Sequence, residues 1–470
     1  NRITEGSIFG QLLLFFFPIL FGTFFQQLYN TADAMVVGRF VGKQALAAVG
    51  GSTSTLINLL VGFFVGLSSG ATVVISQFYG ARKADKVHWA VHTSIAFSVI
   101  GGIIFMIVGL VGSPWALEAM KTPEDVMGHA VVYIRIYFLG IIVNLVYNMG
   151  AGILRAVGDS RRPLYFLIAS CFTNIILDVL LVAVLGMGVA GAALATITGQ
   201  IVSALLAVYY LFRPKSFRLK RVSFKPDAEI LKHVLPLGIS SFLTQVSIVV
   251  IMAVMNNVLV IYGAGSKYGA DIPMTVVGIV MKVFQIVISV VVGIAAGAQP
   301  IVGYNYGAGL WRRVKLIFRT MMAAEFSVGL VSLICFEVFP VQIISVFGSE
   351  DGLYNEFAVL AFRVFLGGIV LCCIQKSCSI FLQSIGRPAL SMLLSLLRDF
   401  VLSVPLTLVL PRFFGVTGAL YSGPAADVIS FGAAVLCMAA VFRKLNRLED
   451  GEVALSGASQ GGLAVERKIC

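Results

Sequence analysis

Two aspartates lie inside long apolar segments of this chain, Asp33 in the first segment and Asp178 in the fifth. An ionised side chain at the centre of a bilayer costs at least about 2.5 to 3.5 kcal/mol. Such residues are therefore retained when they pair with an opposite charge, contact water or have a function. Gln26, Asn30 and Asp33 follow one another at i, i+4 and i+7, which places them on one face of a helix. We expect this polar stripe to face the protein interior or a cavity.

A second polar stripe lies on the fifth apolar segment, where Asn174 and Asp178 are four residues apart. With a rise of about 1.5 Å per residue, Asp33 lies about 6 Å from the outer end of its helix, and Asp178 lies about 22 Å along its own. Thr196 lies about 12 Å from the outer end of the next segment, at a similar depth. These four side chains can therefore meet inside one bundle of helices.

The group suits either of two ions. Carboxylate, amide and hydroxyl oxygens are ligands for a hard cation such as Na⁺. Alternatively, two neighbouring carboxyl groups can hold and release a proton, because burial and a nearby like charge both oppose ionisation. A structural role, in which each aspartate pairs with a neighbouring helix, is the third interpretation. We favour ion binding, because two acids that converge in lipid are costly to keep for packing alone.

The elements that position these residues are transmembrane helices. The chain has 470 residues, of which 59% are hydrophobic and 12% charged, whereas soluble domains average roughly 45 to 50% and 25%. Lipid offers no hydrogen-bond partners to the backbone, so continuous apolar segments of this length must be helices. We predict an all-α polytopic membrane protein with twelve transmembrane helices in two six-helix bundles. The predicted spans are 11–37, 46–76, 88–111, 129–152, 163–185, 188–211, 230–261, 272–298, 315–338, 357–378, 389–410 and 415–442.

The two bundles are predicted from a repeat in the sequence. Tyr79-Gly80-Ala81 recurs as Tyr306-Gly307-Ala308, and the Gly-Val-x-Gly-Ala segment at 188–192 recurs at 415–419. The copies lie about half a chain apart, which is typical of a duplicated transporter half and too long for a solenoid period. The predicted domains are an N lobe over 1–211, a basic cytoplasmic linker over 212–229, a C lobe over 230–442 and a disordered cytoplasmic tail over 443–470.

Lysine and arginine predict the orientation in the membrane. They are concentrated in the loops after the even-numbered spans, so both termini are expected in the cytoplasm. The net charge of +12 follows from this asymmetry, and it does not indicate nucleic-acid binding, because the chain has no compact basic domain. The seven cysteines form no Cys-x-x-Cys pair, and the sequence contains no phosphate loop or nucleophile motif. We therefore predict neither an enzyme nor a cofactor.

Other side chains inside the apolar segments are candidates for a substrate cavity. Aromatic rings and thioethers suit bulky lipophilic cations through cation–π attraction and adaptable contacts, which makes Tyr29, Tyr137 and Met281 candidates, together with Asn30. Lys282 lines such a cavity, extends to the membrane surface or pairs with an acid. Pro18 removes one backbone hydrogen bond inside the first span, so a bend is expected there.

Several charges of the second half are expected to form ion pairs with structural roles. Arg398, Asp399 and Asp427 lie near the middle of the last two predicted spans, so we predict an ion pair between these helices. Glu325 and Arg363 are expected to form another pair.

The run Gln299-Pro300-x-x-Gly303-Tyr304-Asn305-Tyr306-Gly307-Ala308 and the repeated Gly-Val-x-Gly-Ala segment resemble the multidrug and toxic compound extrusion (MATE) family, in particular its MepA-like branch. The resemblance covers Phe9 to about Arg443. It implies a V-shaped pair of six-helix bundles in the cell membrane, acting as a monomer, that exports small lipophilic organic cations in exchange for H⁺ or Na⁺. A role in antibiotic resistance is implied as well.

The resemblance also implies roles for particular residues. Relatives have an ion site made by an acid on the first helix, an Asn and an Asp on the fifth and a Thr on the sixth. The residues at these positions here are Asp33, Asn174, Asp178 and Thr196. Similarly, Gln26, Tyr29 and Asn148 match residues that line the N-lobe cavity, and Pro18 matches a proline at which the first helix bends.

One departure from the family bears on where the ion binds. NorM-type relatives have acids on the seventh and tenth helices, whereas 236–262 and 356–375 contain none here except Glu356 at the membrane boundary. Ion coupling is therefore expected in the N lobe. The alternatives are a lipid-linked oligosaccharide flippase of the same superfamily and, in a different class, a membrane receptor or scaffold that transports nothing.

Overall fold

The structure is a computed structural model that describes residues 3, 5–50, 52–212, 228–348 and 352–460. Its regular elements are all helical over these residues. Ten helices are long and apolar enough to cross a membrane, and the number rises to twelve when each of two bent helix pairs counts as one span. The predicted all-α polytopic fold is confirmed. Of the predicted linker over 212–229, residues 213–227 lie outside the described part.

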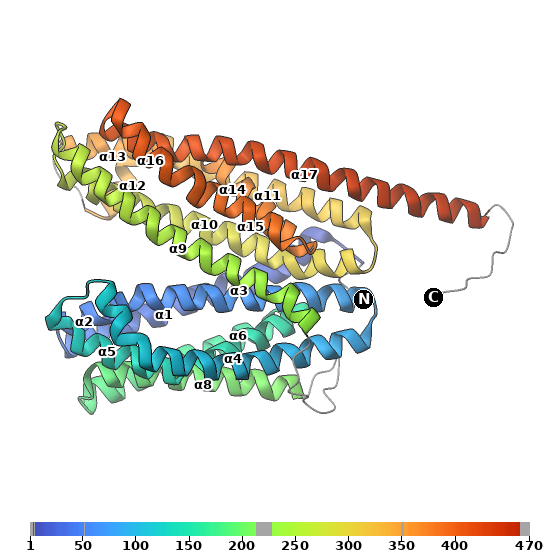
Figure 1. Ribbon diagram of the computed structural model, residues 1–470, viewed down its shortest axis with the longest axis horizontal. Coiled ribbons are helices and arrows are strands. Elements are labelled where there is room, and N and C mark those ends of the chain that lie inside the picture. Colours follow the sequence, from blue (N-terminus) through green and yellow to red (C-terminus); the bar gives the residue numbers. More distant parts are fainter. Residues whose placement is uncertain (1–2, 4, 51, 213–227, 349–351, 461–470) are drawn as a thin grey trace.

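The two halves of the chain form two bundles that pack against each other (Figure 1). The helices of the N lobe are α1 (Ile8–Phe40), α2 (Lys43–Gly50), α3 (Ser52–Gly80), α4 (Ala84–Ala119), α5 (Glu124–Leu139), α6 (Ile141–Ala156), α7 (Arg161–Asp178) with the π-helical segment η1 (Val179–Val184), and α8 (Gly188–Phe212). Those of the C lobe are α9 (Ala228–Ala264), α10 (Asp271–Gly307), α11 (Trp311–Val338), α12 (Pro340–Val346), α13 (Gly352–Phe365), α14 (Ile369–Ser384), α15 (Pro388–Leu396) with the π-helical segment η2 (Leu397–Leu402), α16 (Ser403–Phe414) and α17 (Val416–Gln460).

The fourth span of each lobe is bent. Helices α5 and α6 meet at 50°, and α13 and α14 meet at 45°. Glycines occupy both bends, Gly140 in the first and Gly367 with Gly368 in the second. A Cβ atom on Gly140 would lie 2.7 Å from Ile197 of α8, so the missing side chain lets the bend pack closely against the next helix.

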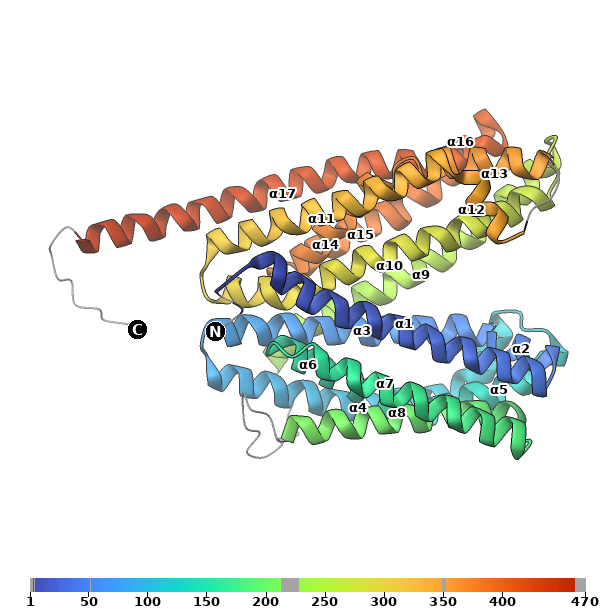
Figure 2. The ribbon, with the colours of Figure 1, turned by 180° about the vertical axis from the view of Figure 1, so that it is seen from behind.

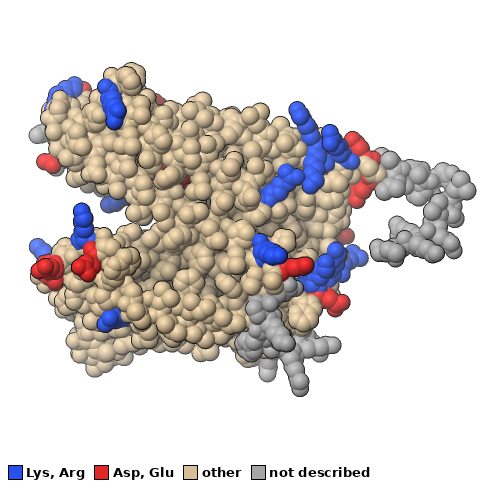
Figure 3. Space-filling model, viewed as in Figure 1, with Lys and Arg blue, Asp and Glu red and all other residues tan. Residues whose placement is uncertain are grey.

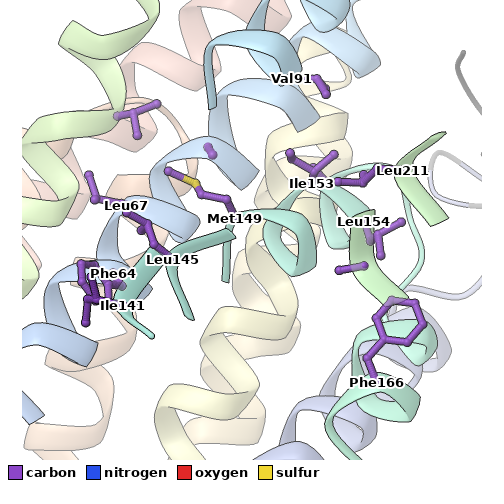
Figure 4. Packing of buried hydrophobic residues seen from close by; sticks show 14 of the residues in the cluster. Phe64, Leu67, Val91, Ile141, Leu145, Met149, Ile153, Leu154, Phe166 and Leu211 are labelled. Carbon is purple, nitrogen blue, oxygen red and sulfur yellow. The ribbon is translucent and has the colours of Figure 1, made fainter. Parts of the chain in front are cut away.

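Each lobe has its own apolar core. In the N lobe, Phe64 and Leu67 of α3 pack with Leu145 and Met149 of α6, and all four are almost fully buried (Figure 4). A second cluster in the C lobe is formed by α9, α10, α13 and α14, with Phe357 and Phe362 among its fully buried members. Because each lobe is densely packed, a movement of one lobe relative to the other must change the contacts between them and not the interior of either lobe.

The outer surface of the helices is apolar, and the ends carry the charge. Large side chains such as Val111, Trp115 and Leu436 are exposed, as expected for residues that face lipid tails. Figure 3 shows a broad uncharged belt, with lysine and arginine gathered mainly at the end where the chain termini lie. At the opposite end the same view shows an open notch between the lobes.

The repeated Tyr-Gly-Ala motifs form one part of the contact between the lobes, which also includes the packing of α3 on α9. A Cβ atom on Gly80 of α3 would lie 2.0 Å from the carbonyl oxygen of Tyr304 on α10, and one on Gly307 would lie 2.0 Å from that of Gln77. The glycines therefore let α3 and α10 cross backbone to backbone at the end where the N-terminus lies (Figure 1). The two motifs have equivalent places in their lobes and make the same kind of contact.

Helix α1 packs against both lobes (Figure 2). Its first turns, with Ile8, Leu12 and Phe15, belong to an apolar cluster of the C lobe, whereas its second half lies against α7 and α8 of the N lobe. Pro18 lies between these two parts, and the helix continues through it without interruption. The predicted N lobe over 1–211 thus begins with a segment that packs on the C lobe.

The last helix extends further than expected. The sequence predicts a disordered tail from residue 443, but α17 is helical to Gln460, and 461–470 lie outside the described part. Lys315 of α11 bonds to Asn446 at 2.8 Å and forms an ion pair with Glu449, so the segment is held against the C lobe. Contacts between distant residues of this kind are not visible in a hydropathy pattern.

Candidate functional site

Asp33, Asn174, Asp178 and Thr196 lie together inside the N lobe. Thr196 Oγ1 donates a hydrogen bond to Asp33 Oδ2 at 3.0 Å. With the Asn174 amide oriented so that Nδ2 donates, this nitrogen lies 2.8 Å from Asp33 Oδ1 and 3.1 Å from Asp178 Oδ2. Each of the four residues is at most 6% exposed. One amide thus connects two buried carboxyl groups that belong to different helices.

Local helix geometry explains how these side chains come so close. Gly199 of α8 faces α7, and a Cβ atom there would lie 2.9 Å from the Ser170 carbonyl oxygen and 3.3 Å from Asn174 Cβ. The close crossing of α7 and α8 brings Asn174 toward the helix that carries Thr196. Helix α7 then ends at Asp178, where the π-helical segment η1 begins. Such segments are frequent at functional sites, because they change the direction of the side chains that follow.

The site lacks a basic partner among the described residues. No described ion pair includes Asp33 or Asp178, and Asp178 Oδ1 has no hydrogen-bond partner in the described part of the chain. Two carboxylates at this depth are stable only when a cation or a proton compensates their charge. The donor set of two carboxyls, one amide and one hydroxyl fits either a proton or a hard cation such as Na⁺.

Tyrosines and asparagines surround the acid pair. Tyr29, Tyr133 and Tyr137 are buried, and Asn144 Nδ2 donates to the Tyr137 hydroxyl at 3.0 Å. Asn148 Nδ2 in turn donates to Asn144 Oδ1 at 2.6 Å. Tyr133 and Asn144 are not among the predicted cavity residues, although each lies four residues before one of them and therefore shares its helix face. The polar network extends from α1 across the bend between α5 and α6.

The remaining candidate residues of the N lobe differ in how far they are buried. Gln26 is half-buried and Asn30 is exposed. The buried face of α1 runs through Tyr29 and Asp33, so Asn30 lies beside this face and does not reach the acid pair. Pro18 lines a lateral groove between α1 and α7, together with Phe21.

Two candidates lie in the C lobe. Met281 lines a cavity there, with Met255, Phe284 and Gln285. Lys282 is exposed and is not part of that lining. The structure thus connects Tyr137 and Asn148 through Asn144 in the N lobe and places Met281 at a separate cavity in the C lobe.

A chain of four charges lines the C-lobe cavity. Arg398 Nε donates to Asp427 Oδ1 at 2.9 Å, and its Nη1 donates to Asp399 Oδ1 at 3.0 Å. The predicted ion pair between the last two spans is confirmed. Lys376 of α14, which is not part of the predicted pair, donates to Asp399 Oδ2 at 2.7 Å. Two acids and two bases compensate each other, so this cluster needs no external ion, in contrast to the N-lobe pair.

We expect Asp427→Asn to destabilise the C lobe, because it leaves Arg398 and Lys376 with one carboxylate between them. Breaking a buried ion pair in this way costs about 3 to 5 kcal/mol. Thermal unfolding of the purified protein in detergent measures the effect. Glu356→Gln is the matched control, since Glu356 pairs with Lys267 at the exposed surface, where ion pairs contribute little. Equal unfolding temperatures for the two variants would contradict the prediction.

The expected pair between Glu325 and Arg363 is wrong. Arg363 Nε donates instead to the carbonyl oxygen of Glu337 at 3.1 Å. Glu325 lies twelve residues earlier on the same helix, α11, which is about 18 Å along its axis. Glu325 is fully buried, and neither of its carboxyl oxygens has a hydrogen-bond partner among the described residues.

Two lobes of membrane-spanning helices, a notch between them and an uncompensated acid pair inside one lobe define a membrane transporter. The sequence profile of the MatE family matches residues 18–180 in the N lobe and 236–409 in the C lobe. The chain belongs to this family, the MATE transporters, as the sequence resemblance predicts. Members of the family are transporters and not enzymes.

Similar proteins match this chain over most of their own length. A probable multidrug resistance protein, YoeA of Bacillus subtilis (strain 168), is 28% identical over 441 residues, which cover 92% of this chain and 93% of the relative. The multidrug export protein MepA of Staphylococcus aureus (strain NCTC 8325 / PS 47) is 23% identical over 92% of this chain and 94% of its own.

Among solved structures, a MATE crystal structure in the bent conformation has a TM-score of 0.85 at 24% identity, over 95% of this chain and 98% of that one. An outward-facing multidrug resistance MATE transporter of the MOP superfamily has a TM-score of 0.84 at 24% identity, with the same coverage. These similarities establish the fold.

Proposed function

We propose that the protein is a secondary multidrug efflux antiporter, which exports small lipophilic organic cations across the cell membrane in exchange for H⁺ or Na⁺. The observation that carries this proposal is the pair of buried carboxyl groups, Asp33 and Asp178, connected by Asn174 without a basic partner among the described residues. The names of the relatives, a multidrug resistance protein and a multidrug export protein, support the substrate class.

The direction of transport follows from the proposed orientation. Figure 3 places lysine and arginine mainly at the end where the termini lie, which favours a cytoplasmic location for that end. The lobes are in contact at this end through Gly80 and Gly307 and further along through the packing of α3 on α9, and Figure 3 shows a notch between them at the other end. The described conformation is then open to the outside, ready to release substrate and to accept a coupling ion.

Helix α1 connects ion binding to the lobe contact. Asp33 lies in its N-lobe half, its first turns pack on α10 of the C lobe, and Pro18 lies between the two parts. A proton or Na⁺ at Asp33 changes the hydrogen bonds with Asn174 and Thr196, and α1 transmits this change to the lobe interface. The two conformations must differ in their affinity for the ion and for the substrate, since equal affinities shift no equilibrium.

The driving force depends on the charge of the substrate: one-for-one exchange of a monovalent organic cation for H⁺ or Na⁺ moves no net charge and is driven by the concentration gradient of the ion, whereas export of a neutral substrate also uses the membrane potential. One charge that crosses 100 mV supplies about 2.3 kcal/mol. This energy supports roughly a fiftyfold gradient of a neutral substrate for each coupled cation. The substrate itself would contact aromatic and amide side chains of the N lobe, for which Tyr29, Tyr137 and Asn148 are the candidates.

Proteoliposomes with separately imposed pH and Na⁺ gradients test the proposal. We expect one of the two gradients to drive ethidium transport, and dissipation of that gradient to stop it. A rate of ethidium transport that is independent of both gradients would overturn the proposed ion coupling. Translocation of a lipid-linked oligosaccharide in place of ethidium would favour the flippase alternative, and the absence of both activities would favour a receptor or scaffold.

A further inference from the structure

Glu325 is a buried acid outside the site described above. It lies in the middle of α11, is 0% exposed, and both of its carboxyl oxygens lack a hydrogen-bond partner in the described part of the chain. Ser377 of α14 is also 0% exposed and is the polar neighbour of Glu325, but the two side chains do not reach ordinary hydrogen-bond geometry. Unsatisfied polar groups are rare in packed interiors, so a pair of them at one helix contact requires an explanation.

The groups around Glu325 offer no compensating positive charge. The titratable groups that face it are the thiols of Cys373 and Cys378 on α14. Helices α1, α10, α12, α13 and α17 also pack against α11, and among the described residues none of their charged groups interacts with Glu325. The nearby bases Lys376 and Arg398 are already paired with Asp399 and Asp427. An ionised carboxylate in such a place is strongly disfavoured, and a protonated carboxyl is accommodated.

The position of Glu325 connects it to a bend. Gly329, one turn further along α11, packs on the first turn of α14, where a Cβ atom on it would lie 2.9 Å from Val370 Cα. This turn directly follows the 45° bend between α13 and α14. Gly368 in the bend packs against Asp427. A change in the angle between α13 and α14 would therefore shift α14 along α11. It would alter the surroundings of Glu325 and of the four charges around Asp427.

We propose that Glu325 is a second proton-binding site, which holds a proton when α11 and α14 are packed as described and releases it when the bend changes. The proposal rests on the proposed transport function, but it is independent of whether the N-lobe ion is H⁺ or Na⁺. A proton fits better than a metal cation, because the contact between α11 and α14 offers one carboxyl and one hydroxyl among the described residues, too few oxygens to hold a metal cation.

The test measures proton release and infrared absorption by the purified protein in weakly buffered detergent when ethidium is added. We expect the wild type to release protons and to lose part of the carbonyl absorption of protonated carboxyl groups. Glu325→Gln should release fewer protons and should lack that spectral change, because glutamine has the shape of the protonated acid but cannot titrate. Glu325→Asp, which keeps a titratable group, should retain both signals.

Comparison with an N-lobe variant separates this proposal from the proposed function. Asp33→Asn should stop efflux in proteoliposomes while the infrared signal of Glu325 persists. Identical proton release and identical spectra in the wild type and in Glu325→Gln would overturn the second site, and a complete lack of proton release by the wild type would do so as well. Loss of gradient-driven efflux in the wild type would instead contradict the antiporter.

Discussion

Replacing Asp33 by Asn is expected to abolish gradient-driven ethidium efflux. Asn can still accept the hydrogen bond from Thr196, so the contact between α1 and α8 is preserved. It can neither bind a proton at neutral pH nor supply a negative ligand to Na⁺, so the ion no longer distinguishes the two conformations. We expect the initial rate of efflux from loaded vesicles to fall to that of vesicles without protein.

Asp178→Asn is expected to have the same effect, because the ion site requires both carboxyl groups. The amide also removes a buried charge, so the thermal stability of the purified variant should be equal to or higher than that of the wild type. Asp125→Asn, at an exposed aspartate in the first turn of α5, is the control and should transport normally. Near-normal efflux in both Asp33→Asn and Asp178→Asn would refute the assignment of ion coupling to the N lobe.

Helix geometry explains why much of this site is visible in the sequence. The rise per residue fixes the depth of a side chain in the membrane, and on this basis Asp33, Asp178 and Thr196 are expected at one level. The structure brings them together. Depth alone does not determine which way a side chain points around the helix axis. Asn30 illustrates this limit, since it is adjacent to buried Tyr29 and is itself exposed.

Residues whose role depends on a partner are harder to predict. Lys376 gains its significance from Asp399, which is reached only through the packing of α14 against the last two spans. The wrong pairing of Glu325 with Arg363 has the same origin. Opposite charges in one lobe suggest a pair, but Arg363 contacts α11 at Glu337, twelve residues from Glu325. The π-helical segment that places Arg398 and Asp399 beside Asp427 has no clear signature in the sequence.

The fold is predictable to the extent that hydropathy determines it. Long apolar segments and the duplicated motif predict twelve spans in two lobes, and the structure agrees when each bent pair is one span. Hydropathy reports which residues can enter lipid, but not whether a helix bends within it or continues beyond it. The sequence pattern therefore does not predict the bends at Gly140 and Gly368 or the extension of α17 to Gln460, which only the structure shows.

Gly307→Ala and Gly80→Ala are expected to prevent the lobes from closing at the end where the termini lie. An added Cβ atom would lie 2.0 Å from a backbone carbonyl oxygen of the facing helix, either Gln77 or Tyr304. A backbone atom cannot move away as a flexible side chain can, so α3 and α10 must separate. The substitution itself favours the helix by about 1 kcal/mol, and any loss of function must therefore come from the contact between the lobes.

A second glycine of α10 provides the matched control. A Cβ atom on Gly278 would have no neighbouring atom within 4 Å, so Gly278→Ala should retain both helix stability and wild-type efflux. For Gly307→Ala we expect efflux to be lost and a cysteine introduced near the α3–α10 crossing to become reactive toward a polar thiol reagent. The conformation open to the outside requires this crossing. If Gly307→Ala instead shows efflux at the wild-type rate and the introduced cysteine stays unreactive, the motif glycines do not hold the lobes together.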